Sequence, residues 1–91
     1  MLQYELAWHS NKARNVFERL PRNVKERLST HISALLQPPP PPNYDIIALK
    51  GPLKGRFRLK VGQGWRVIYS YCHGRRVLHV YYAGPRENTP Y

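Results

Sequence analysis

The chain has 91 residues, the size of one small domain with a single core, and we take residues 1–91 as that domain. Lysine and arginine number 15 against five acidic residues, which gives a formal net charge of +10. The one cysteine, Cys72, excludes an internal disulfide, and no stretch is long and apolar enough to span a membrane. The first residues lack the pattern of a signal peptide, so we expect a cytoplasmic protein.

The positive charge is concentrated in the second half of the chain. Residues 1–48 contain six Lys or Arg and four Asp or Glu, a net of +2, whereas residues 49–91 contain nine and one, a net of +8. Clustered cations are typical of proteins that bind nucleic acid, an anionic membrane surface or an acidic protein. A surface that is merely soluble would scatter its cations, so we expect an anionic partner.

The first half of the chain predicts a strand and then two helices. Apolar residues alternate over Leu2–Trp8, which is typical of a strand. A helix is predicted over residues 11–20, with Ser10 or Asn11 as its N-cap and Pro21 as its end.

A second helix follows over residues 22–36, so the two helices form a helical hairpin. The five prolines Pro38–Pro42 predict a short polyproline II rod that connects this helix to the sheet. A docking site for a proline-reading domain is the alternative. Residues 43–48 have no clear assignment, and we expect Ile46 and Ile47 to pack under the helices.

Three further strands are predicted over residues 56–61, 65–72 and 75–83. On the last strand, Val77, His79 and Tyr81 should share one face, and Leu78, Val80 and Tyr82 the other. The predicted order is β-α-α-β-β-β. The fold class is therefore α+β, with the helical hairpin packed on one face of an antiparallel sheet.

The alternation in residues 56–61 sets three cations, Arg56, Arg58 and Lys60, on one face of a strand, with apolar residues on the other. The next strand returns beside it and brings Arg66 to the same face. Such a row of cations repels itself unless an anion binds there. We interpret this face as a phosphate-binding surface.

Other chemistries find little support in the residues. Cys72 lies within a predicted strand with no acid or histidine to activate it. The four histidines, His9, His31, His73 and His79, are dispersed, so we predict no metal and no cofactor. What remains is a set of cations accompanied by His79, Tyr81 and Tyr91.

This set suits RNA cleavage, because RNA carries its own nucleophile, the 2′-hydroxyl. Cleavage needs a group that takes the 2′-hydroxyl proton, charge that stabilises the phosphorane, and a donor for the 5′-oxygen. Arginine and lysine supply that charge. For Tyr69, Tyr71, Tyr81 and Tyr82 the alternative is packing in the sheet, which we expect for at least half of them.

The sequence resembles the RelE/ParE superfamily of toxins over nearly its whole length. The resemblance rests on the combination and order of five segments: ARNVFERLP (13–21), LKG (49–51), RFRLK (56–60), WRVIY (65–69) and GPR (84–86). It implies the toxin of a type II toxin–antitoxin system, a ribosome-dependent endoribonuclease or mRNA interferase that inhibits translation. A ParE-like inhibitor of DNA gyrase and a non-catalytic RNA- or ribosome-binding module are the alternatives.

The resemblance also implies roles for individual residues. Lys60, Arg66, Arg86 and Tyr91 become the catalytic set, with Arg66 stabilising the phosphate and Arg86 the general acid. In the family a tyrosine near the C-terminus stacks or acts as the base, and Tyr91 is the candidate here. Because Tyr91 falls about one residue early, Lys60 or His79 is the alternative base. RNA contacts are expected from Lys54, Arg56, Arg58 and His79.

The partners implied by the resemblance are mRNA, the ribosome and an acidic RelB-like antitoxin, and no membrane. A segment of the antitoxin would fold across the basic face. The toxin–antitoxin complex is expected to be a higher oligomer.

Overall fold

The computed structural model describes residues 3–90, which form one mixed sheet and two helices. The elements are β1 (Glu5–Trp8), α1 (Asn11–Glu18), α2 (Arg22–Leu35), β2 (Asp45–Ala48), β3 (Phe57–Val61), β4 (Trp65–Cys72) and β5 (Val77–Pro85), with short 3₁₀ turns η1 (Gly51–Leu53) and η2 (Arg86–Asn88). The strands lie in the order β1-β5-β4-β3-β2. All neighbours are antiparallel except β1, which runs parallel to β5. The predicted α+β fold is confirmed.

The helices begin and pack as their sequences dictate. The Ser10 hydroxyl caps α1 by accepting a hydrogen bond from the backbone N–H of Ala13 at 3.1 Å. In α2 the apolar stripe of Leu28, Ile32 and Leu35 is buried against the sheet. Among residues 3–90, neither helix has the length and apolar character that crossing a bilayer requires.

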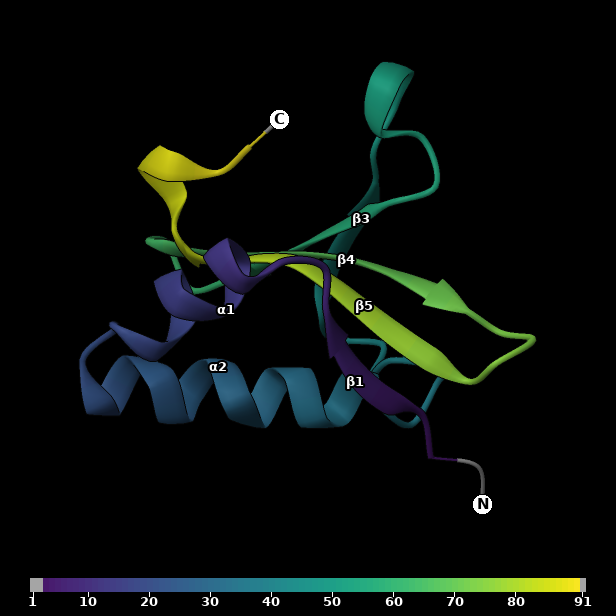
Figure 1. The fold of residues 1–91 in the computed structure, drawn as a ribbon, viewed down its shortest axis with the longest axis horizontal. Helices are drawn as coiled ribbons and strands as arrows, with labels where there is room; N and C mark the ends of the chain where they lie inside the picture. Colours follow the sequence, from purple (N-terminus) through teal and green to yellow (C-terminus); the bar gives the residue numbers. More distant parts are fainter. Residues whose placement is uncertain (1–2, 91) are drawn as a thin grey trace.

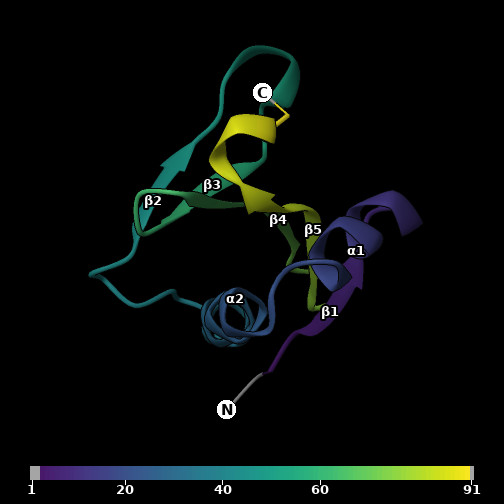
Figure 2. The same ribbon diagram turned by 90° about the vertical axis from the view of Figure 1, so that its left-hand side faces the viewer.

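The two faces of the sheet have different surroundings. The helix α2 lies across one face, and α1 lies beside the second half of β5, past the end of β1 (Figures 1 and 2). The β2–β3 loop with η1 and the C-terminal segment with η2 both rise on the side opposite α2 (Figures 1 and 2). This second side is the one that the cations of β3 occupy.

The structure corrects the prediction for residues 43–48. Asp45–Ala48 forms an additional edge strand, paired with β3. Ile46 lies opposite Leu59 and packs against the core, as expected. Ile47 was expected under the helices, but it is 46% exposed, because strand alternation turns it to the opposite face.

A β-bulge corrects the faces predicted for the last strand. Ile68 pairs with Tyr82, and the next residue, Tyr69, pairs with Val80, so Tyr81 is the extra residue. Tyr69 and Val80 belong to the core, and Ile68 and Tyr82 lie outside that cluster. Tyr82 is therefore on the face opposite Val80, contrary to the prediction.

The connector Pro38–Pro42 joins α2 to β2, as predicted, but it is not a straight rod. The chain bends at residues 37–39 and turns again at residues 42–43. Tyr44 closes that second turn, since its N–H donates to the carbonyl of Pro41 at 3.1 Å.

Candidate nucleic-acid interface

The face of the sheet opposite α2 carries the candidate site, and we call it the basic face. Directly paired residues of neighbouring strands share a face. The pairing therefore sets the following residues of β3, β4 and β5 on it: Arg58, Lys60, Arg66, Ile68, Tyr82 and Gly84. The predicted alternation of cations and apolar residues in β3 is thus realised in the sheet.

Three predicted site residues come together at one end of the basic face. Lys60 lies directly opposite Arg66, and Arg66 lies opposite Gly84. The N–H of Arg86 donates to the carbonyl of Gly64 at 2.8 Å, which holds η2 against the β3–β4 turn. We call Lys60, Arg66 and Arg86 the cation cluster.

Arg66 is the buried member of the cluster, with only 6% of its surface exposed. Its Nη1 donates to the carbonyl of Trp65 at 2.8 Å and, at 3.4 and 3.5 Å, lies near the carbonyls of Gln63 and Gly62. The β3–β4 turn therefore fixes this guanidinium in place. Arg86, by contrast, is exposed and Lys60 is half-buried.

Arg58 is already engaged with a carboxylate. Its Nη2 donates to Oδ1 of Asp45 on β2 at 3.1 Å, and the Arg58 side chain is 18% exposed. Its Nε is buried with no hydrogen-bond partner in the described residues. The sequence reasoning missed Asp45, because the short run Asp45–Ala48 carries no strand signal of its own.

The remaining predicted residues lie elsewhere. Arg56 stacks over the ring of Tyr81, with Cζ 3.8 Å from the ring centroid. His79 pairs with Ser70, four residues from Arg66 along β4, a distance of about 13 Å at strand rise. Lys54 is exposed in the loop that follows η1.

Tyr91 lies outside the described residues. Of the seven predicted residues that the structure describes, it gathers three at one end of the basic face and distributes the other four along that face and on the β2–β3 loop.

Of Tyr69, Tyr71, Tyr81 and Tyr82, the first belongs to the core and the second packs against it. Burial raises the pKa of Tyr71 to about 12, and its hydroxyl donates to the carbonyl of Leu35 at 2.6 Å. Burial also raises the pKa of Tyr69, and that of Tyr82, which is buried on the opposite face. These hydroxyls stay protonated near neutral pH, which suits packing rather than proton transfer.

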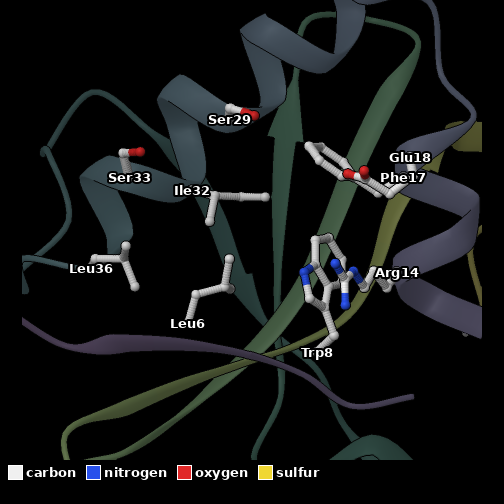
Figure 3. Close-up of a pocket in the computed structure, with 9 residues that line it drawn as sticks. All are labelled: Leu6, Trp8, Arg14, Phe17, Glu18, Ser29, Ile32, Ser33 and Leu36. Carbon is white, nitrogen blue, oxygen red and sulfur yellow. The ribbon is translucent and has the colours of Figure 1, made fainter. Parts of the chain in front are cut away.

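A hollow lies away from the basic face. It has a volume of about 440 Å³ between β1, α1 and α2, and its lining includes Leu6, Trp8, Phe17, Ile32 and Leu36 (Figure 3). Arg14 and Glu18 are its charged lining residues. Because this lining is mainly apolar and lacks the cation cluster, the hollow does not provide a phosphate site.

The fold matches solved toxin structures over almost the entire chain. The RelE–RelB complex from Pyrococcus horikoshii matches with a TM-score of 0.74 at 25% identity, covering 96% of this chain and 99% of that one. The isolated RelE toxin of E. coli matches with a TM-score of 0.73 at 23% identity, covering 94% and 87%. The RelBE2 toxin–antitoxin complex from Mycobacterium tuberculosis gives 0.73 at 18% identity, covering 92% and 99%.

The chain has the fold of the RelE-like toxin superfamily. No protein-family model matches the sequence, and no curated protein matches it. The helix α2 lies on the opposite face of the sheet, so the β2–β3 loop and the C-terminal segment flank the basic face (Figure 2). The start of α1 borders it beside Tyr82.

Proposed function

We propose that this protein is the toxin of a type II toxin–antitoxin system and that it cleaves mRNA on the ribosome. The observation that carries the proposal is the cation cluster, placed on the basic face of a RelE fold. Lys60, Arg66 and Arg86 come from β3, β4 and η2, so only the folded chain brings them together. Two arginines at neighbouring backbone positions suit a phosphate that gains negative charge in the transition state, with Lys60 beside them.

The proposed reaction uses the 2′-hydroxyl of the substrate. Its oxygen attacks the adjacent phosphorus, the bond from phosphorus to the 5′-oxygen breaks, and a cyclic phosphate and a 5′-hydroxyl form. Arg66, held by the turn, stabilises the phosphorane without reorganising, and Arg86 gives a proton to the leaving 5′-oxygen.

The base that takes the 2′-hydroxyl proton is assigned by position. Lys60 lies directly opposite Arg66, whereas His79 lies about 13 Å farther along the sheet. A base must reach its proton within hydrogen-bond distance of the same phosphate. We therefore assign this role to Lys60 among the described residues. In this step its amine is neutral, and Arg66 and Arg86 supply the positive charge.

One observation favours a second candidate, a non-catalytic protein that binds RNA or the ribosome. Arg66 is buried and its Nη1 donates to carbonyls of its own turn. In this alternative Arg66 only stabilises the turn, and the exposed Arg86 contributes charge to binding. The cleavage assay described below separates the two candidates.

The partner that we propose is an acidic, RelB-like antitoxin. The matched structures from Pyrococcus horikoshii and Mycobacterium tuberculosis contain a toxin with its antitoxin. An acidic segment laid across the basic face would neutralise the cation cluster and exclude RNA. In this proposal the protein acts in the cytoplasm, where mRNA and ribosomes meet, and it forms a higher oligomer with the antitoxin.

The test is induced expression with primer extension on a reporter mRNA, run beside a gyrase supercoiling assay. We expect cuts in phase with codons, and loss of at least 100-fold in cleavage for Arg86→Ala. Arg75→Ala is the matched control, because Arg75 is an exposed arginine of the β4–β5 turn, at the other end of the sheet.

The outcomes discriminate between the candidate functions. Arrest of growth without any cut mRNA would favour the non-catalytic binder, and lost supercoiling would favour a gyrase inhibitor. Equal toxicity of Arg86→Ala and the parent would rule out the catalytic assignment of Arg86.

A further inference from the structure

A layered group of side chains lies at the end of the basic face that is farther from the cation cluster. The Arg56 guanidinium sits over the Tyr81 ring, with Cζ 3.8 Å from the centroid. The His9 ring is 4.7 Å from the same ring, tilted by 48°. None of these three residues is fully buried, so the group is open to solvent.

Tyr81 is held in this position from two directions. It is the extra residue of the β5 bulge, so it pairs with no residue of β4. Its hydroxyl is 2.9 Å from the Ser70 hydroxyl on β4. A ring fixed at both ends loses little conformational entropy when a ligand stacks on the group.

A cavity opens next to Tyr81, between the start of α1 and the C-terminal segment. Its volume is about 410 Å³, within the range of small-ligand sites. Its polar lining includes Lys12, Ser10 and Asn88. The rest of the lining, Ala13, Val16, Tyr82 and Pro90, is apolar, so the cavity suits a flat ring with a few polar edge groups, such as a base.

We propose that Arg56 and Tyr81 form a nucleobase-stacking subsite for single-stranded RNA, with the base lying on the exposed face of the Arg56 guanidinium. Bases unstacked from single-stranded RNA commonly stack on aromatic rings or on arginine planes. The subsite rests on the proposed function, because it takes RNA as the ligand of the basic face.

The position of the subsite sets which base it holds. Ser70, beside Tyr81, is four residues from Arg66 on β4, about 13 Å at strand rise. At the duplex spacing of about 3.4 Å per nucleotide along one strand, this distance spans about four nucleotides, and fewer if the strand is extended. The subsite therefore holds a base within about four nucleotides of the phosphate at the cation cluster.

The experiment uses the full chain and a single-stranded RNA methylated at every 2′-oxygen, so that it cannot be cleaved. One nucleotide at a time is replaced by an abasic residue, and binding is followed by fluorescence anisotropy. We expect the parent protein to bind about 10-fold more weakly when one position near the centre of the site is abasic, and to tolerate the others.

The variants separate stacking from charge and from folding. Tyr81→Leu and Arg56→Lys should lose the preference for the intact base, since the first removes the ring and the second keeps the charge but removes the plane. Tyr81→Phe keeps the ring and should retain the preference for the intact base. Arg75→Lys is the matched control for Arg56→Lys, and thermal melting checks that each variant folds.

The failure of the subsite can be told from the failure of the proposed function. Equal binding of intact and abasic RNA at all positions, by a protein that cuts mRNA in cells, would overturn the subsite and leave the nuclease. A base preference lost in Tyr81→Leu, without any mRNA cleavage in cells, would support the subsite and contradict the catalytic assignment. If the parent protein binds neither the intact RNA nor the abasic RNA, the subsite is overturned as well.

Discussion

Arg58 and Arg66 show how surroundings decide what a cation can do. Alternation along the strands predicted their face correctly, but it could not predict their partners. Arg58 meets Asp45 of a strand that the sequence did not reveal, and Arg66 meets carbonyls of its own turn. The charge of Arg58 is therefore neutralised by a carboxylate, and the guanidinium of Arg66 is fixed by its own turn, although both were expected to be free for phosphate.

The ion pair of Arg58 gives a prediction at the scale of the residue. Asp45→Asn keeps the shape of the side chain and removes its charge, so Arg58 becomes available to a phosphate. We expect affinity for single-stranded RNA to rise about 3-fold to 10-fold, and the log–log salt slope to steepen by about 0.7 for the added contact. Titrations at several salt concentrations measure both quantities.

Glu18→Gln is the matched control for this substitution. Glu18 pairs with Lys25 on the helical side at 3.5 Å, away from the basic face, and the change in net charge is the same. Equal gains in affinity for the two variants would mean that net charge alone acts, and that Arg58 contributes no phosphate contact.

At the scale of the element, the β3–β4 turn joins the two strands that carry Arg58, Lys60 and Arg66. Gly62 begins the turn with a φ of +61°, a conformation that residues with a Cβ rarely adopt. The same turn supplies the carbonyls that hold Arg66 and the carbonyl of Gly64 that holds Arg86. The backbone of this turn therefore positions two of the three cations in the cluster.

Gly62→Ala tests this role of the turn. The positive φ should lower the free energy of unfolding by about 1 kcal/mol, and the added Cβ, 2.7 Å from Nη2 of Arg27, requires that flexible side chain to move. Gly64→Ala is the control, because its Cβ would meet nothing within 4 Å. Urea denaturation of both variants measures the difference, and equal stabilities would contradict the argument.

The β5 strand shows at the same scale what periodicity alone misses. A strict two-residue period put Val80 and Tyr82 on one face, but the bulge at Tyr81 moves Tyr82 to the other. A bulge depends on how one strand pairs with its neighbour, so the sequence of a single strand does not indicate it.

At the scale of the whole molecule, the core between α2 and the sheet includes tyrosines as well as aliphatic residues. Tyr69 is 1% exposed, and Tyr71 packs against the core from its edge. Burial raises the pKa of both hydroxyls above the ordinary value of 10, to about 12 for Tyr71. The folded state therefore keeps these protons at pH values where the unfolded chain releases them.

The sign of this linkage predicts loss of stability at alkaline pH. Below pH 10 both states keep the tyrosine protons, so this contribution is complete. Between pH 10 and about 12 only the folded state binds them, so the free energy of unfolding falls as pH rises. Thermal melting from pH 8 to 11.5 should show the fall, and Tyr71→Phe should make it shallower. A Tyr71→Phe curve that stays parallel to the parent curve would contradict this assignment.

The sequence by itself determined the class of the fold, the face on which the cations of β3 lie and the burial of α2 through its apolar stripe. These features follow from local periods of two and 3.6 residues, which a single segment displays. Tertiary structure alone decided that Asp45 meets Arg58, that Tyr81 leaves the ladder and meets Arg56, and that Arg86 docks beside Arg66. Each of these depends on pairing or turn geometry between segments, and no local pattern encodes which partners a strand will find.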